Sequence, residues 1–195
     1  MTDRSETQNT VKPAPNADGL AAAARAASKK GPPPVHLWNP PFCGDLDMEI
    51  RTDGTWFYQG TPMGREALVK LFASILKLED GRYFLVTPVE KVGIRVEDAP
   101  FIAVDCVAEG SDLTFTTNVG DTVTAGPENP IRVRFASDGE PRPYVHVRRG
   151  LEARIDRKTF YRLVDIAQPV PHEGEDWLGL TSGGVFFPIT RMADL

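Results

Sequence analysis

The residues best placed to do chemistry are arginines that alternate with apolar residues along three expected strands, 131–135, 144–148 and 151–155. Side chains of a strand alternate between its two faces, so each strand carries its polar side chains on one side. If the strands pair in sequence order, these side chains meet on one surface. They are Arg132, Arg134, Tyr144, His146, Arg148, Glu152 and Arg154. Guanidinium groups bind phosphate or carboxylate oxygens two at a time, and one glutamate does not neutralise four arginines, so the pattern predicts anion binding.

Within this predicted surface, Arg132, Arg148 and Arg154 are the expected anion clamps and Tyr144 the expected hydrogen-bond donor. The alternative is a solvated sheet face on which scattered cross-strand pairs neutralise the arginines. The first part of the chain offers four further candidates for the same site. They are Lys91 as a point charge, Arg65 at the start of a helix, and Trp56 and Tyr58 as a stacking surface for a ring. An aromatic pair of this kind also fits a hydrophobic core.

Catalysis receives little support from the sequence. Asp45, Asp47 and Glu49 alternate and share a face if extended, which fits a metal or acid–base role but equally a solvated edge. Cys43 lies in an expected loop with no base nearby in the sequence. The three histidines lack metal-binding spacing, and the phosphate-loop, dinucleotide and nucleophile-elbow motifs are missing. We therefore expect no catalytic residue, metal or cofactor, with a hydrolase as the least favoured reading.

Composition and charge narrow the class of partner. The chain of 195 residues has a net charge of −5, whereas residues 131–163 carry nine Lys/Arg and four Asp/Glu, a local 9 − 4 = +5. An acidic protein with one basic segment is not expected to bind nucleic acid through its overall field, and a small anion fits better. No apolar run reaches the roughly 20 residues needed to span a bilayer. Two cysteines are too few for a disulfide scaffold and indicate the cytoplasm.

An internal sequence repeat predicts how the chain is organised. Residues 63–72 resemble residues 155–164 without a gap, and each segment fits the start of an amphipathic helix, with Gly64 and Asp156 as N-caps. Each segment follows an expected hairpin, with turns at 53–54 and 149–150. Similarity between unrelated amphipathic helices is the alternative explanation. Duplication predicts two related halves, residues 35–110 and 111–195, after a disordered tail at residues 1–34.

The remaining pattern predicts many short strands and few helices. Helices are expected at residues 64–78 and 157–167. Strands are expected at residues 48–51, 55–58, 83–86, 92–96, 101–107, 113–117, 122–125, 131–135, 144–148, 151–155, 177–180 and 185–189. Helices that occur singly among consecutive strands are typical of an α+β fold with antiparallel sheets.

Several of these segments resemble a known family. The run DGTWFYQGTPMGR at residues 53–65, with segments 86–91, 98–101, 117–118, 143–144 and 149–153, resembles the bacterial domain-of-unknown-function family numbered 1285. The resemblance covers residues 36–188. It implies a duplicated α+β arrangement whose C-terminal half resembles a pleckstrin-homology-like partial barrel capped by a helix. It also implies a signalling role with a nucleotide-like ligand between the halves, without any established activity or site residue.

Together these observations predict a non-catalytic ligand-binding or regulatory protein that holds a small phosphorylated or nucleotide-like anion where its two halves meet. The alternative of a different class is a protein–protein interaction module whose sheet face or exposed edge docks a peptide or an acidic partner.

Overall fold

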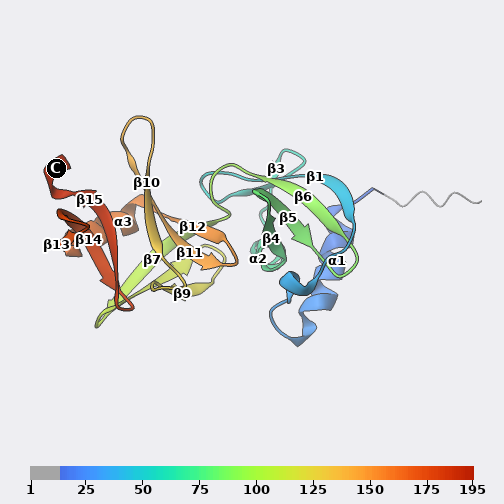
Figure 1. Ribbon diagram of the computed structural model, residues 1–195. Coiled ribbons are helices and arrows are strands. Elements are labelled where there is room, and N and C mark those ends of the chain that lie inside the picture. Colours follow the sequence, from blue (N-terminus) through green and yellow to red (C-terminus); the bar gives the residue numbers. More distant parts are fainter. Residues whose placement is uncertain (1–13) are drawn as a thin grey trace, which may run out of the picture.

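The computed structural model describes residues 14–195 and forms two lobes that lie side by side (Figure 1). We call residues 14–96 the first half and residues 101–195 the second half, with residues 97–100 connecting them. Both halves combine β-sheets with helices, so the predicted α+β class is confirmed. Within residues 14–195, no helix is both long enough and apolar enough to cross a membrane.

The first half is a six-stranded sheet, sheet A, with two helices. Its strands are β1 (Phe42–Ile50), β2 (Trp56–Tyr58), β3 (Thr61–Pro62), β4 (Leu76–Glu79), β5 (Arg82–Val86) and β6 (Lys91–Val96). Its helices are α1 (Ala17–Ala27) and α2 (Glu66–Ser74), with 3-10 turns η1 (Ser28–Lys30) and η2 (Val35–Leu37). The strand order is β3-β2-β1-β6-β5-β4. Phe72 of α2 stacks on Trp56 of β2, with ring centroids 6.4 Å apart, which fixes the helix against one face of the sheet.

The second half contains another six-stranded sheet, sheet B, followed by a helix and a three-stranded sheet C. Sheet B comprises β7 (Phe101–Glu109), β8 (Asp112–Thr117), β9 (Thr122–Thr124), β10 (Ile131–Phe135), β11 (Pro141–Arg148) and β12 (Leu151–Ile155). Then come α3 (Arg157–Ile166), β13 (Gln168–His172), β14 (Glu175–Ser182), β15 (Val185–Arg191) and η3 (Met192–Asp194). Sheet C lies at the end of the molecule remote from the first half (Figure 1).

Sheets A and B share one topology, which fits a duplication. Each consists of two three-stranded meanders whose first and last strands, β1 with β6 and β7 with β12, pair in parallel at the centre. The antiparallel prediction is therefore right for the remaining pairs and wrong for these two. The predicted boundary between the halves follows residue 110, which would assign β7 to the first half. In the structure β7 pairs with β8 and β12 and therefore belongs to sheet B of the second half. The helices differ in their position along the chain: α2 connects the two meanders of sheet A, whereas α3 follows both meanders of sheet B.

The helix starts differ between the two halves. Asp156 caps α3 as predicted, because its side chain accepts a hydrogen bond from the Thr159 N–H at 2.7 Å. The predicted cap Gly64 is wrong, since Arg65 is the N-cap of α2. Gly64 has no side-chain acceptor, and the backbone N–H groups of Leu68 and Val69 donate to the Arg65 carbonyl. The same helix ends early at Ser74, because Leu76 pairs with Leu85 of β5 and begins strand β4.

Residues 17–34 also differ from the expected disordered tail, whose residues 1–13 lie outside the described part of the chain. Asn16 caps α1 by accepting a hydrogen bond from the Gly19 N–H at 2.9 Å. Leu20, Ala21 and Ala24 are buried, and α1 packs against α2. Small alanine side chains allow this close approach, and the partner helix cannot be identified from the α1 sequence alone.

Ser182 fastens sheet C to sheet B. The Leu113 N–H donates to Ser182 Oγ at 2.9 Å, and Ser182 Oγ donates to the Ala125 carbonyl at 2.8 Å. The side chain is fully buried. Since buried polar groups are costly to leave unpaired, this hydroxyl fixes the tip of the β14–β15 hairpin.

We predict that Ser182→Ala lowers the free energy of unfolding by about 1–3 kcal/mol, because it leaves a buried N–H and a buried carbonyl without a partner. Urea denaturation followed by circular dichroism measures the loss. Ser137→Ala is the matched control, because Ser137 is exposed in the β10–β11 turn. Equal stability of the two variants would contradict the role assigned to Ser182.

Candidate functional site

The predicted basic surface forms on sheet B. Strands β10, β11 and β12 pair in sequence order, as predicted, and place Arg132 opposite Tyr144 and Tyr144 opposite Arg154. We call this surface the arginine face. Its members are Arg132, Arg134, Arg142, Tyr144, His146, Glu152 and Arg154.

Carboxylates already hold three of the four arginines of the arginine face, namely Arg132, Arg134 and Arg154. Glu152 lies 2.5 Å from Arg134 and 3.5 Å from Arg132. Asp98, from the connection between the halves, lies 3.6 Å from Arg154 and accepts a hydrogen bond from Tyr144 Oη at 2.7 Å. Two acids therefore neutralise half of the charge of the four arginines, and Asp98 was not foreseen because it is distant in the sequence.

Tyr144 acts as a neutral donor in this arrangement. Burial raises the pKa of its hydroxyl, and the hydrogen bond to Asp98 raises that pKa further. The Arg134 guanidinium lies 4.3 Å from the centroid of the Tyr144 ring. The predicted donor role of Tyr144 is thus directed at an internal carboxylate.

Arg148 leaves the arginine face and connects the two halves. An irregularity in the β11–β12 pairing between His146 and Arg148 changes the direction of its side chain. Its Nη1 donates to the Asp121 carboxylate, and its Nη2 donates to the carbonyl of Ala73 in α2 at 2.9 Å. Its guanidinium also lies 4.9 Å from the centroid of the Phe101 ring. Contacts with α2, β7 and the β8–β9 turn leave Arg148 only a quarter exposed.

A pocket of 410 Å³, which we call the inter-half pocket, opens beside Arg148. It is bounded by the segment before η2, by α2, by the β8–β9 turn and by the β11–β12 turn. The polar and charged residues lining it are Lys70, Ser74, Asp121, Arg148 and Arg149. Three cations thus face one carboxylate, which gives the lining a net charge of 3 − 1 = +2. Lys70 and Arg149 were not among the predicted site residues, although the expected hairpin turn at 149–150 was a usable signal.

The other predicted ligand-binding residues lie away from this pocket. Lys91 pairs with Glu79 at 2.7 Å on sheet A, beside the Phe84 ring. Trp56 is buried in the core, Tyr58 packs against the core, and Arg65 is the exposed N-cap of α2. Of the predicted residues, Arg148 alone lines the inter-half pocket. Trp56 therefore stacks on Phe72 rather than on a ligand ring.

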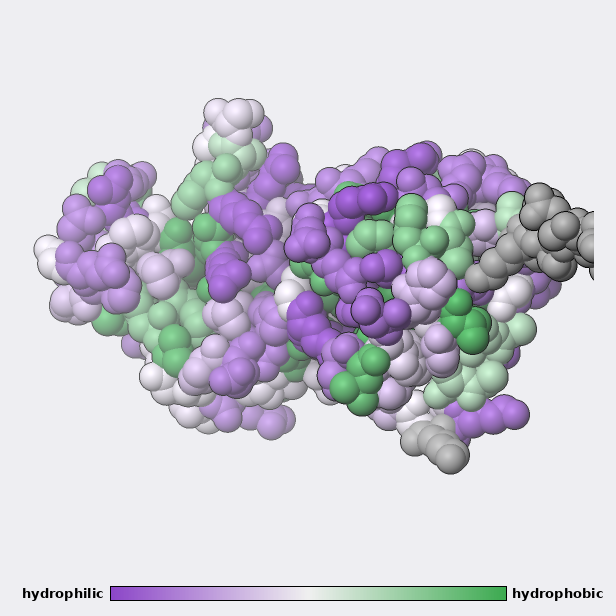
Figure 2. All heavy atoms as spheres, turned by 45° about the vertical axis from the view of Figure 1, so that its right-hand side comes forward, coloured by the Kyte–Doolittle hydropathy of each residue, from purple (hydrophilic) through white to green (hydrophobic). Residues whose placement is uncertain are grey.

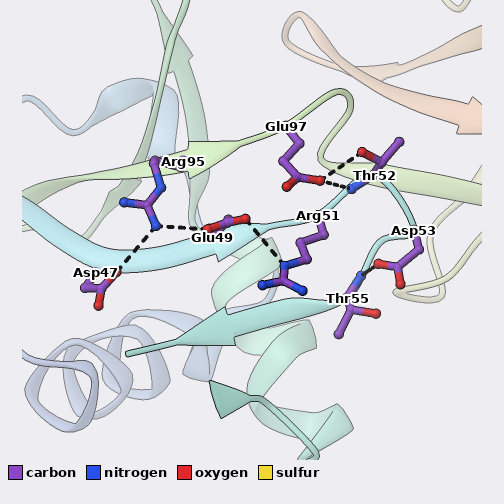
Figure 3. A network of polar contacts seen from close by, with 8 residues as sticks. All are labelled: Asp47, Glu49, Arg51, Thr52, Asp53, Thr55, Arg95 and Glu97. Atoms are coloured by element: carbon purple, nitrogen blue, oxygen red, sulfur yellow. Dashed lines mark hydrogen bonds and ion pairs between the residues drawn. The ribbon is translucent and has the colours of Figure 1, made fainter. Parts of the chain in front are cut away.

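The acidic residues of β1 share one face of sheet A, as their alternation predicts. Arg82 pairs with Asp45 at 3.0 Å, and Arg95 pairs with Asp47 at 3.5 Å and with Glu49 at 2.9 Å. Figure 3 shows Asp47 and Glu49 directed towards Arg95 across the β1–β6 pair. Within residues 14–195, no group of three or more His, Cys, Asp or Glu side chains is arranged to hold a metal ion.

The same network continues around the β1–β2 turn (Figure 3). Glu97 accepts hydrogen bonds from the Thr52 N–H and hydroxyl, both at 2.8 Å, and these bonds lower the pKa of its carboxyl. Asp53 accepts a hydrogen bond from the Thr55 N–H at 2.9 Å, which likewise lowers its pKa. Ionised carboxylates bonded to turn backbone stabilise the loop geometry, so this network is structural.

A second concavity, which we call the apolar groove, has a volume of 680 Å³ and lies within the second half. It separates α3 and the β10–β11 hairpin from sheet C. Its apolar lining includes Phe135, Phe160, Tyr161, Val164, Trp177 and Ile189. Phe135 and Tyr161 are more than half exposed. Figure 2 shows apolar side chains between the projecting hairpin and the end of the molecule formed by sheet C. Exposed aromatic side chains in such a groove are typical of a binding surface.

Comparison with known proteins agrees with this architecture. Residues 33–99 match the N-terminal domain of the family of unknown function DUF1285, and residues 100–189 match its C-terminal domain. The crystal structure of a DUF1285 family protein from Silicibacter pomeroyi is 60% identical in sequence, with a TM-score of 0.81. The match covers 90% of this chain and 97% of that one.

A second DUF1285 family protein of known structure, from Shewanella baltica, is 34% identical, with a TM-score of 0.50. This match covers 62% of the present chain and 91% of that one. No functionally curated protein matches the sequence. Since both domains of the family match in sequence order and meet where sheets A and B are joined, this chain belongs to the DUF1285 family.

Proposed function

We propose that the protein is a non-catalytic ligand-binding protein that holds a small phosphorylated or nucleotide-like anion in the inter-half pocket. The observation that supports the proposal most strongly is the lining of that pocket, where Lys70, Arg148 and Arg149 face the single carboxylate of Asp121. Its 410 Å³ lies in the range of roughly 300–1,000 Å³ typical of small-molecule sites.

The charge in the pocket is accessible to a solute. Arg149 is exposed in the β11–β12 turn, and no ion pair with another residue of the described chain is found for it. Lys70 pairs with Glu66 at 2.6 Å, but both side chains are exposed, so water screens the pair. An anion can therefore recruit Lys70 and Arg149 without breaking a buried contact.

This proposal places the ligand away from the arginine face. Glu152 and Asp98 hold Arg132 and Arg154 on the arginine face. Glu79 holds Lys91 on sheet A. We therefore assign these three cations structural roles outside the ligand site. Tyr58 and Arg65 are likewise outside the proposed contacts. The proposed ligand site still lies between the two related halves, as the sequence analysis expected.

Three finer features belong to the same proposal. The likeness of the second half to a pleckstrin-homology-like partial barrel is supported by sheet B being followed directly by α3. A regulatory role in bacterial signal transduction fits a ligand site between two halves that can respond to occupancy. The small number of cysteines supports a cytoplasmic location.

We predict that pyrophosphate, nucleoside diphosphates or cyclic dinucleotides stabilise the purified protein. At 100 times Kd the gain is about 2.7 kcal/mol, which raises Tm by roughly 5–10 °C for a chain of this size. Arg149→Ala is expected to weaken binding roughly tenfold, because it removes a charge-assisted hydrogen bond. Differential scanning fluorimetry and calorimetric titration give both values.

Arg132→Ala is the control for this prediction, because it removes an exposed arginine from the arginine face and leaves the inter-half pocket unchanged. Binding that is lost in Arg132→Ala but retained in Arg149→Ala would place the ligand on the arginine face. A complete lack of stabilisation by millimolar anions would contradict the proposed function.

The second candidate function is a protein-interaction module, and the exposed aromatic side chains of the apolar groove favour it. We predict that Tyr161→Asp abolishes capture of a stoichiometric partner from a lysate, because a carboxylate is costly to bury in an apolar interface. Val89→Asp is the control, since Val89 is equally exposed but lies outside the groove. Capture that survives Tyr161→Asp would remove the groove from consideration.

A further inference from the structure

We propose that Asp121 is an internal competitor for the ligand of the inter-half pocket. Its carboxylate occupies the Arg148 guanidinium in the way that an anionic group of the ligand would, and thereby lowers the affinity of the site. This inference rests on the proposed function and adds a regulatory element to the same site.

The first argument is that the fold holds Asp121 in place. The Asp121 N–H donates to Thr117 Oγ1 at 3.0 Å, and the Thr117 N–H donates to the Asp121 carbonyl at 2.8 Å. Thr117 is buried, so the β8–β9 turn is fixed at its base. The carboxylate is thus presented to Arg148 by backbone geometry, and no ligand is required to organise it.

The second argument is that a solute can reach this ion pair. Arg148 and Asp121 both line the inter-half pocket, and their side chains are 25% and 38% exposed. Partly exposed ion pairs contribute little net stability, because water competes for both partners. Displacement of the Asp121 carboxylate by a more highly charged anion therefore requires no local unfolding.

The third argument is that Arg148 remains anchored when Asp121 is displaced. Its Nη2 donates to the Ala73 carbonyl, and its guanidinium lies over the Phe101 ring. These contacts hold the guanidinium beside the pocket in either state. Loss of the Asp121 charge changes the lining from +2 to +3, so the consequence is tighter anion binding rather than collapse of the site.

The test is calorimetric titration of inorganic pyrophosphate into the full-length protein, Asp121→Asn and Asp105→Asn at one fixed ionic strength. Asp121→Asn is expected to lower Kd at least about fivefold, which is the lower end of typical coupling between sites. Asp105→Asn is the matched control, because Asp105 pairs with Arg162 outside the pocket. Its Kd is expected to stay within about twofold of the parent value.

Asp121→Ser provides a second variant without the carboxylate and is expected to show the same gain as Asp121→Asn, with folding checked by circular dichroism. An unchanged Kd in both Asp121 variants, while the parent protein binds pyrophosphate, would overturn the competitor role and leave the ligand site intact. An equal gain in Asp105→Asn would also overturn it, because overall charge would then explain the effect. No binding to any variant would instead overturn the proposed function.

Discussion

Arg148 joins three segments that are distant in the sequence and forms a polar link between the two halves. Its hydrogen bond to the Ala73 carbonyl reaches from sheet B to helix α2, while Asp121 balances its charge. The inter-half pocket lies where these contacts meet. A residue that links the halves thus also lines the pocket with a cation.

Elsewhere in the second half, too, carboxylates from earlier in the chain pair with arginines of the basic segment, residues 131–163. Asp98, Asp105 and Asp121 pair with Arg154, Arg162 and Arg148, respectively. Each pair connects a basic side chain of residues 131–163 to a preceding strand, turn or connection. The local excess of positive charge in the sequence therefore becomes a set of cross-links between elements, whereas no such ion pair is found for the exposed turn residue Arg149 within residues 14–195.

Local patterns in the sequence predicted local structure well. The alternation in β10, β11 and β12 placed Arg132, Tyr144 and Arg154 in one row, because period-two alternation and short turns fix the register of neighbouring strands. The sequence did not reveal contacts between residues that are distant in the chain. The carboxylate of Asp98, the packing of α1 on α2 and the change in direction at Arg148 all depend on tertiary contacts. The pocket that we propose as the ligand site lies between the two halves, where the sequence analysis expected a ligand, but of the predicted residues only Arg148 lines it.

Which cationic side chains can bind an added anion is tested most directly by anomalous diffraction from crystals soaked in tungstate, a heavy tetrahedral dianion. Guanidinium groups that carboxylates already hold should not attract it, whereas the side chains around Arg149 should. The strongest anomalous peak is expected between Lys70 and Arg149, beside α2. A peak over Arg132 and Arg154 on sheet B, with none near α2, would contradict this description of the molecule.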